Sequence, residues 1–162
     1  MAQDPIILIA EDDEGHALLI RENLALAGRR DRIEHFSDGQ AILDFFFGPA
    51  SARRAGAGQM YLVLLDINMP KVDGLEVLRR LKADNRVRNI PVYVLTTSDD
   101  ERTIERCHFL GCSAYLQKPT DYDEFERVIR HLGEMIPHGR YAILPPEGGG
   151  PFGFSPATGI AV

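Results

Sequence analysis

The sequence contains no tryptophan, only two cysteines among its 162 residues, and few aromatic side chains, which make up 8% of the chain. Cys107 and Cys112 stand five positions apart, a spacing that matches neither a CxxC redox pair nor a zinc site. The five histidines include no pair at the spacing of metal ligands on one helix face. We therefore expect two free, buried thiols, and these scarcities argue against a zinc enzyme.

Long apolar runs and an excess of basic residues are also missing. No apolar stretch approaches the roughly 20 residues that a membrane-spanning helix needs, and no basic-then-apolar leader opens the chain. Lysine and arginine number 18 against 24 acidic residues, so the net charge is -6 and no positive excess can neutralise nucleic-acid phosphates. We expect a cytoplasmic protein that binds neither a membrane nor nucleic acid directly.

The rest of the composition is ordinary for a globular protein, with 44% hydrophobic and 26% charged residues. The length suits one domain of about 100 to 150 residues with some excess. That excess falls at the C-terminal end, where 11 of the last 26 residues are glycine or proline. We predict one domain over residues 1–136 and a Gly/Pro-rich extension over residues 137–162.

Apolar runs of strand length alternate with segments of helical periodicity. The four residues 62–65 are all large and apolar, which is typical of a strand buried on both faces of a parallel sheet. We expect strands at residues 6–10, 32–36, 62–65, 90–95 and 114–117, and helices around residues 16–27, 37–47, 75–81, 98–110 and 125–132. This alternation predicts a doubly wound α/β domain, with a parallel five-stranded sheet between two layers of helices.

Acidic residues directly follow two of these strands. Glu11 and Asp12 end the first strand, and Asp66 ends the apolar run at 62–65. Open α/β sheets bind their ligands at the carboxyl ends of the strands, so the three carboxylates should converge there if the two strands are neighbours. Like charges held together raise one another's pKa unless a cation neutralises them. Hard oxygen ligands of this kind suit Mg²⁺, or Mn²⁺ in its place.

Two further strand ends supply a hydroxyl group and a positive charge. Thr96 follows the fourth expected strand, and Lys118 follows the fifth. A metal ion, a hydroxyl and an ammonium group around one nucleophilic carboxylate can hold the three equatorial oxygens of a phosphoryl group during its transfer. The pattern therefore indicates phosphorylation of an aspartate, with Asp66 as the acceptor.

Each of these residues has a simpler explanation when it is taken alone. Lys118 would more often be a solvated surface lysine, and Thr96 would suit any strand end. The acids at 11–14 could serve the first turn of the following helix. Ser98 and Glu101 fit a capping box, so Ser98 is expected to be a helix N-cap rather than a reactive hydroxyl. The phosphorylation hypothesis depends on the fact that four different strands each end in a residue type that this chemistry requires.

Several motifs occur in a fixed order along the chain: Glu11-Asp12, Asp66 within Leu-Leu-Asp-Ile-Asn-Met-Pro-Lys-Val-Asp-Gly, Thr96 after Pro-Val-Tyr-Val-Leu, Tyr115, and Lys118-Pro119. In order and spacing they resemble the receiver domain of two-component response regulators, over roughly residues 5–136. The resemblance implies a flavodoxin-like (βα)5 three-layer sandwich with strand order 2-1-3-4-5. Glutamate at position 11, where aspartate is commoner in that family, is a mild departure that leaves the chemistry intact.

The resemblance also implies a metal site around the acceptor. Asp66 would be the phosphoacceptor. Asp12, Asp66 and the backbone carbonyl of Asn68 would bind Mg²⁺ directly. Glu11 would reach the ion through a water molecule.

The remaining matching residues are implied to bind the phosphoryl group and to respond to it. Thr96 would hold a phosphoryl oxygen, Lys118 would pair with the group, and Tyr115 would change rotamer when Thr96 moves. The bond before Pro119 is commonly cis in the family, and we expect the same here. Phosphorylation would then shift the population between two packings of the surface around the fourth helix and the fifth strand. Such a protein is a phosphoacceptor rather than an enzyme, although it promotes its own phosphorylation and dephosphorylation.

A narrower resemblance concerns regulators that lack an output domain. The Leu-Thr-Thr-Ser run at 95–98, the loop after the second helix and the short extension resemble stand-alone regulators encoded with bacterial and cyanobacterial phytochrome kinases. This resemblance implies a sensor histidine kinase as partner, in the narrower case a bacteriophytochrome. The apolar patch at 138–144 predicts a homodimer that buries Tyr141, Ile143 and Leu144. The alternative is a disordered tail with a few apolar residues.

Two other functions compete with this hypothesis. A magnesium-dependent phosphatase with an aspartyl-phosphate intermediate also needs an aspartate at a strand end, but that class resembles Asp-x-Asp, whereas this chain has Asp66-Ile67-Asn68. A module that is never phosphorylated and only binds partners is the second alternative. A nucleotide-binding domain is disfavoured, because acids stand where a glycine-rich loop would follow the first strand.

Overall fold

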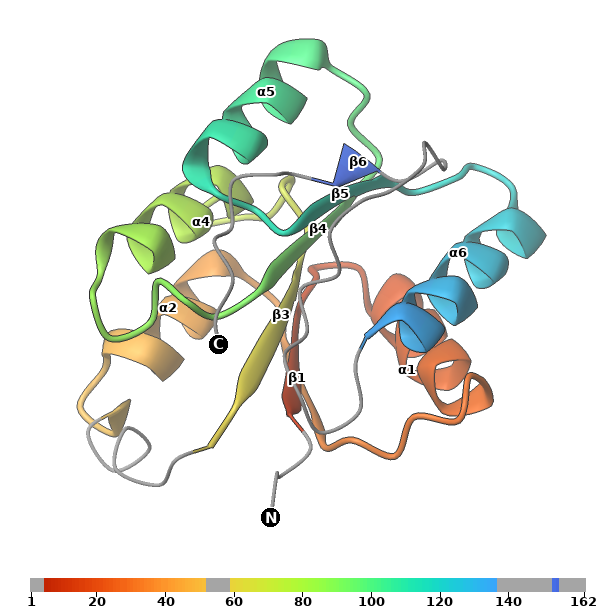
Figure 1. Cartoon of the computed structure of the whole chain (residues 1–162), viewed down its shortest axis with the longest axis horizontal. Helices are drawn as coiled ribbons and strands as arrows, with labels where there is room; N and C mark the ends of the chain where they lie inside the picture. The colour runs from red at the N-terminus through yellow and green to blue at the C-terminus, as the bar shows by residue number, and fades with distance from the viewer. Residues whose placement is uncertain (1–4, 52–58, 137–152, 155–162) are drawn as a thin grey trace.

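The computed structural model describes residues 5–51, 59–136 and 153–154 of the chain. Five parallel strands lie in the order β2-β1-β3-β4-β5, and a short sixth strand pairs with β5 at the edge. The strands are β1 (Ile6–Ala10), β2 (Ile33–Phe36), β3 (Tyr61–Leu65), β4 (Val92–Thr96), β5 (Ala114–Gln117) and β6 (Gly153–Phe154). The described helices alternate with the five parallel strands, which confirms the predicted flavodoxin-like α/β fold (Figure 1).

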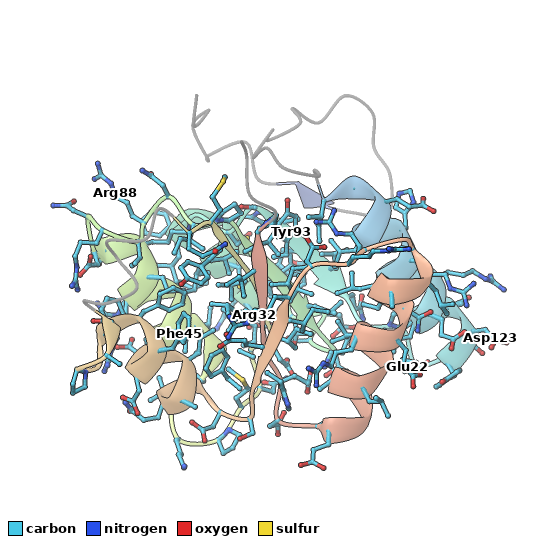
Figure 2. All side chains as sticks on the ribbon, turned by 90° about the horizontal axis from the view of Figure 1, so that it is seen from below. Glu22, Arg32, Phe45, Arg88, Tyr93 and Asp123 are labelled. Carbon is cyan, nitrogen blue, oxygen red and sulfur yellow. The ribbon has the colours of Figure 1, made fainter. Side chains whose placement is uncertain are left out.

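The helices form a layer on each face of the sheet. One layer contains α1 (Glu14–Leu26) and α6 (Tyr122–Met135), and the other contains α2 (Gly39–Phe47), α4 (Gly74–Ala83) and α5 (Glu101–Leu110), as Figure 1 shows. Side chains fill the space between the sheet and the helices (Figure 2). Within the described ranges, no helix has both the length and the apolar character that crossing a membrane requires.

The central strands β1 and β3 are apolar because both of their faces are covered. Leu8 and Val63 point to the side of α2, α4 and α5, where they pack in one hydrophobic cluster. Ile7 and Leu62 alternate with them and join the cluster on the side of α1 and α6. This arrangement explains the continuous apolar run at 62–65, since an exposed sheet face would have placed polar residues at every second position.

Aspartate caps the N-terminus of every helix in the described ranges. In each case its carboxylate accepts a hydrogen bond from the backbone N–H of the third helical residue, which satisfies one of the free donors of the first turn. The capping residues are Asp13, Asp38, Asp73, Asp100 and Asp121.

The expectation that Ser98 caps the helix before residue 110 was wrong. The N-cap is Asp100, whose carboxylate accepts hydrogen bonds from the backbone nitrogen of Thr103 at 2.9 Å and from its hydroxyl at 2.7 Å. An ionised carboxylate is the stronger acceptor for a helix N-terminus with its positive dipole end. Ser98 instead lies in the loop between β4 and α5, where its carbonyl accepts a hydrogen bond from Tyr115.

The C-terminal extension contributes one element that the sequence pattern did not predict. Gly153 pairs with Tyr115 and Phe154 with Ala114, so β6 runs antiparallel to β5. Residues 137–152 and 155–162 lie outside the described residues, and the expected dimerisation patch at 138–144 falls among them. The division of the chain at residue 136 therefore stays a prediction.

Candidate functional site

The site is built at the carboxyl ends of β1 and β3, which are neighbours in the sheet. Ala10 and Leu65 are register partners in this parallel pair, so the next residues, Glu11 and Asp66, leave the sheet side by side. The backbone N–H of Asp66 donates to the carbonyl of Ala10 at 3.0 Å and fixes this arrangement. The predicted convergence of the acids therefore follows directly from strand order and register.

Three carboxylates meet at this edge of the sheet. One oxygen from each of Glu11, Asp12 and Asp66 lies within 4.8 Å of the others. Glu11 and Asp66 are only 2% and 7% exposed, whereas Asp12 is exposed to solvent. Hard carboxylate oxygens that are buried on one side and open to water on the other suit a small divalent cation that keeps part of its hydration shell.

Lys118 is the positive charge within this cluster. It follows β5, and its buried ammonium group donates to Oε2 of Glu11 and, at 3.2 Å, to Oδ2 of Asp66. Burial raises the pKa of the Glu11 carboxyl to about 7, and the neighbouring Asp66 also raises it, while Lys118 lowers it. One lysine therefore does not neutralise three carboxylates, and the residual negative charge favours a bound cation.

Thr96 lies at the end of β4, between the strands that carry Asp66 and Lys118. It is fully buried, and its register partner on β5 is Gln117. Its carbonyl accepts a hydrogen bond from the backbone N–H of Lys118 at 2.7 Å, and its hydroxyl oxygen lies 3.5 Å from the backbone nitrogen of Ser98. The threonine and the lysine thus stand next to each other at this edge of the sheet.

Tyr115 connects β5 to the loop after Thr96. Its ring is buried, and its hydroxyl donates to the carbonyl oxygen of Ser98 at 2.5 Å. Burial raises the pKa of this hydroxyl to about 12, so it remains protonated and a donor at neutral pH. Thr97 alone separates Thr96 from Ser98, so this hydrogen bond anchors the loop that directly follows Thr96.

The loop from Asp66 to Gly74 is tightly held beneath the carboxylates. The backbone N–H of Asn68 donates to Oδ1 of Asp66 at 3.2 Å, and that of Gly74 donates to the carbonyl of Ile67 at 2.8 Å. A β-carbon on Gly74 would overlap the carbonyl oxygen of Asp66. Glycine is therefore the one residue type that fits at position 74, and the loop keeps Asn68 next to the Asp66 carboxylate.

The structure differs from one expectation at Lys118-Pro119. None of the peptide bonds in the described ranges is cis, so the predicted cis bond before Pro119 was wrong. The trans form is the intrinsically preferred one, by about 0.5 to 1 kcal/mol for a residue before proline.

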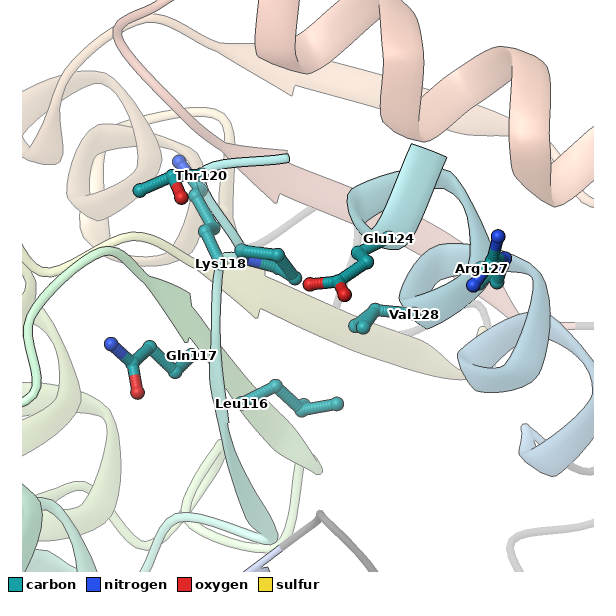
Figure 3. A pocket seen from close by; sticks show the side chains of 8 residues that line it. Leu116, Gln117, Lys118, Thr120, Glu124, Arg127 and Val128 are labelled. Atoms are coloured by element: carbon teal, nitrogen blue, oxygen red, sulfur yellow. The ribbon is translucent and has the colours of Figure 1, made fainter. Parts of the chain in front are cut away.

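A cleft of about 580 Å³ opens on the other side of Lys118, between the end of β5 and the first turns of α6. Figure 3 shows Gln117 and Lys118 on one wall and Glu124, Arg127 and Val128 of α6 on the other. Lys118 is the one residue that the cleft shares with the charged cluster. The three carboxylates do not line this cleft and lie at the carboxyl ends of β1 and β3 instead.

Sequence reasoning missed one member of the cluster. Nδ1 of His16 lies 3.2 Å from the ammonium nitrogen of Lys118 and 3.9 Å from Oε1 of Glu11. A single histidine near the start of a helix carries no motif, so only the three-dimensional arrangement identifies it.

Known proteins share this fold and sequence pattern. Residues 7–130 match the family model described as the response regulator receiver domain. A relative from Methanothrix harundinacea, described as the probable methanogenesis regulatory protein FilR2, is 39% identical over 136 residues, which cover 82% of this chain and 84% of the relative.

Three solved structures illustrate the likeness. A response regulator receiver domain from Rhodospirillum rubrum superimposes with a TM-score of 0.76 at 42% identity, covering 81% of this chain and 92% of that one. The Mn²⁺-bound form of response regulator Rcp1 has a TM-score of 0.75 at 27% identity, covering 88% and 99%. The phosphorylated cyanobacterial phytochrome response regulator RcpA has a TM-score of 0.73 at 30% identity, covering 82% and 93%.

Proposed function

Because the chain belongs to the response regulator receiver domain family, we propose that it accepts a phosphoryl group on Asp66 from a sensor histidine kinase. The observation that carries this proposal is the position of Lys118, whose ammonium group contacts both Asp66 and Glu11 beside Asp12. Receiver domains are typically phosphoacceptor signalling modules rather than enzymes. The proposed role is therefore to receive the group and to change conformation in response.

In the proposed transfer, an oxygen of the Asp66 carboxylate forms a bond to phosphorus while the phosphorus–nitrogen bond to the donor histidine breaks. The histidine leaves as a neutral imidazole once it has taken up a proton, and Asp66 becomes an acyl phosphate. Lys118 is placed to neutralise charge on the phosphoryl oxygens, and Thr96 to donate its hydroxyl proton to one of them.

The carboxylate cluster fits a divalent cation, and Mn²⁺ is bound in the related Rcp1 structure. We propose that Asp12, Asp66 and the backbone carbonyl of Asn68 hold Mg²⁺, or Mn²⁺, with Glu11 reaching it through a water molecule. When bound, such an ion neutralises the negative charge that builds up between acceptor and phosphoryl oxygens.

The conformational response is proposed to run from Thr96 to Tyr115. Acceptor oxygens of the new phosphoryl group would draw the Thr96 hydroxyl toward Asp66. The movement would strain the short bond from Tyr115 to the Ser98 carbonyl, since Ser98 lies two residues after Thr96. The surface formed by α5 and β5 would then shift between two packings.

Self-hydrolysis of the acyl phosphate is expected to be unobstructed. Asn68 and Ser98 each lie two residues beyond a key site residue, where receiver domains leave a path for the attacking water. Both side chains are small and neutral. An acyl phosphate that survives for days without a phosphatase would contradict this point.

The kinase is proposed to be a bacteriophytochrome. This proposal is supported by the likeness to RcpA, which is described as a phytochrome response regulator. Phosphotransfer profiling against purified histidine kinases of the source organism tests it: preferential transfer from a phytochrome kinase supports the proposal, and transfer from an unrelated kinase alone refutes it. A cytoplasmic location follows from such a partner and stays a prediction.

A homodimer is also proposed, formed with the apolar residues Tyr141, Ile143 and Leu144 of the extension. Sedimentation of the full-length chain and of a chain truncated after Pro137 tests it. A truncated chain that sediments as a monomer, beside a dimeric full-length chain, supports the proposal. Identical association states of the two chains refute it.

The phosphoacceptor function itself is tested with a small phosphodonor. Acetyl phosphate with Mg²⁺ should add one phosphoryl group to the wild-type chain, as measured by intact mass, and none to Asp66→Asn. Equal labelling of both chains would refute the assignment. Turnover of p-nitrophenyl phosphate would instead favour the phosphatase, and no labelling of either chain would favour a module that is never phosphorylated.

A further inference from the structure

His16 is held in place by contacts on two sides of its ring. It is the third residue of α1, and its backbone N–H donates to Oδ1 of the N-cap Asp13 at 2.9 Å. The imidazole and the ring of Phe125 in α6 form a T-shaped pair, with 5.4 Å between centroids and an interplanar angle of 64°. On its other side, Nδ1 lies 3.2 Å from the ammonium nitrogen of Lys118.

The ammonium group of Lys118 determines which ring nitrogen of His16 carries the proton. An ammonium group has three N–H donors and no acceptor, so Nδ1 of His16 can only accept a hydrogen bond from it. A ring that accepts through Nδ1 is neutral and carries its proton on Nε2. The side chain is 40% exposed, so Nε2–H can reach water.

With His16 included, the three donors of the Lys118 ammonium have three partners: Glu11, Asp66 and His16. A flexible lysine side chain would otherwise have to lose rotamer freedom at the moment of reaction. Partners that fix the ammonium group in advance remove that cost, because the charge is already where the phosphoryl oxygens will develop.

We propose that His16 is a positioning residue for Lys118. Its neutral ring, braced by Phe125, accepts one ammonium proton and keeps the charge directed at Asp66. During phosphorylation the ammonium group keeps its hydrogen bonds to His16 and Glu11. The N–H that donates to Asp66 in the unphosphorylated protein then donates to a phosphoryl oxygen instead. This role rests on the proposed phosphoacceptor function, whereas the contact itself can be examined in the unphosphorylated protein.

The first experiment reads the tautomer by ¹⁵N NMR of the full chain labelled at histidine, without metal or phosphodonor and at neutral pH. His16 should show an unprotonated Nδ1 and a protonated Nε2, and Lys118→Met should remove this fixed preference. A protonated Nδ1, or the same tautomer pattern in Lys118→Met, would overturn the proposal.

The second experiment separates positioning from packing with two substitutions. His16→Phe keeps a ring against Phe125 but has no acceptor, and we expect its maximal phosphorylation rate with acetyl phosphate and Mg²⁺ to fall about tenfold, as for one lost hydrogen bond to a charged group. His16→Asn offers a carbonyl oxygen at the δ position and should restore the rate to within about threefold of wild type. His131→Phe, an exposed substitution on α6, is the matched control and should not change the rate.

Equal rates for wild type and His16→Phe would overturn the proposal, as would failure of His16→Asn to restore the rate while its melting temperature equals that of wild type. If the wild-type chain were not phosphorylated at all, the proposed function would be refuted instead. In that case the tautomer measurement still decides whether His16 holds Lys118.

Discussion

The ammonium nitrogen of Lys118 lies 3.2 Å from Oδ2 of Asp66, although the two residues are 52 positions apart and follow strands that are not neighbours. β4 separates β3 from β5, so the lysine side chain crosses the end of β4, where Thr96 lies. Lys118 therefore links the other two strand ends, because its ammonium group contacts Asp66 and its backbone N–H donates to the carbonyl of Thr96.

Replacing Lys118 with methionine should destabilise the metal-free protein. The change leaves Glu11 and Asp66 buried without a cation, a loss of about 3 kcal/mol in the free energy of unfolding. Mg²⁺ should recover part of this loss because it supplies the missing positive charge. Urea unfolding with and without Mg²⁺ measures both effects.

Lys71→Met is the matched control, since the ion pair of Lys71 with Asp38 is largely exposed on the lysine side and should contribute less than about 1 kcal/mol. An unfolding free energy of Lys118→Met equal to that of wild type, in the absence of metal, would show that the buried ion pairs contribute nothing.

Magnesium affinity should depend on pH through Glu11. The raised pKa of about 7 means that a proton competes with the metal below neutral pH, because a cation site requires the ionised carboxylates. The dissociation constant should therefore fall about tenfold between pH 6 and pH 8, in proportion to the ionised fraction. Calorimetric titration at the two pH values measures it.

Glu11→Gln removes the titrating proton while keeping a hydrogen-bond acceptor for Lys118. In this variant the affinity should be weaker at pH 8 and nearly the same at both pH values. A variant that keeps the tenfold dependence would assign the titration to another group.

Much of the site could be predicted from the sequence because its residues stand at strand ends. Asp66 follows an uninterrupted apolar run, and neighbouring parallel strands bring their carboxyl ends together whatever the details of packing. The fold and the convergence of Glu11, Asp12 and Asp66 are confirmed for this reason.

Three features could not be predicted from the sequence: the N-cap of α5, the place of His16 and the strand β6. Each depends either on a choice among neighbouring residues that are equally suitable or on a contact between residues far apart in the chain. In the run Ser98-Asp99-Asp100 every residue can cap a helix, and only the path of the chain after β4 selects Asp100. His16 acquires its place from Phe125 and Lys118, both more than 100 positions away in the chain. β6 forms by backbone pairing at a sheet edge, which needs no side-chain pattern.

Tyr115→Phe should lower the free energy of unfolding by about 1 kcal/mol, since the hydroxyl donates to the Ser98 carbonyl at 2.5 Å. The pKa near 12 keeps the hydroxyl protonated, so the loss should be the same at pH 6 and pH 9. Denaturant unfolding at both pH values checks this. Tyr122→Phe, at an exposed position on α6, should change stability by no more than about 0.5 kcal/mol. Equal effects of the two substitutions would argue against the Tyr115 bond.

Gly39→Ala should be strongly destabilising, because a β-carbon at this position would overlap the carbonyl oxygen of Val72 in the loop after Asp66. The backbone of Val72 cannot move aside as a side chain can. We therefore expect the free energy of unfolding, measured in urea, to fall by about 3 kcal/mol. Gly28→Ala meets no atom and carries only the strain of its φ of 84°, which should cost about 1 to 2 kcal/mol. If Gly28→Ala were the more damaging change, the close contact between the start of α2 and the loop after Asp66 would not hold.

Asp66, alone among the acidic residues of the cluster, is proposed to receive the phosphoryl group. Borohydride reduces an aspartyl phosphate to homoserine, so treatment of the acetyl phosphate-labelled protein followed by peptide mass mapping locates the acceptor. We expect homoserine at position 66 and at no other acidic residue. Homoserine at position 12, or a phosphate found on a serine, threonine or histidine instead, would contradict it.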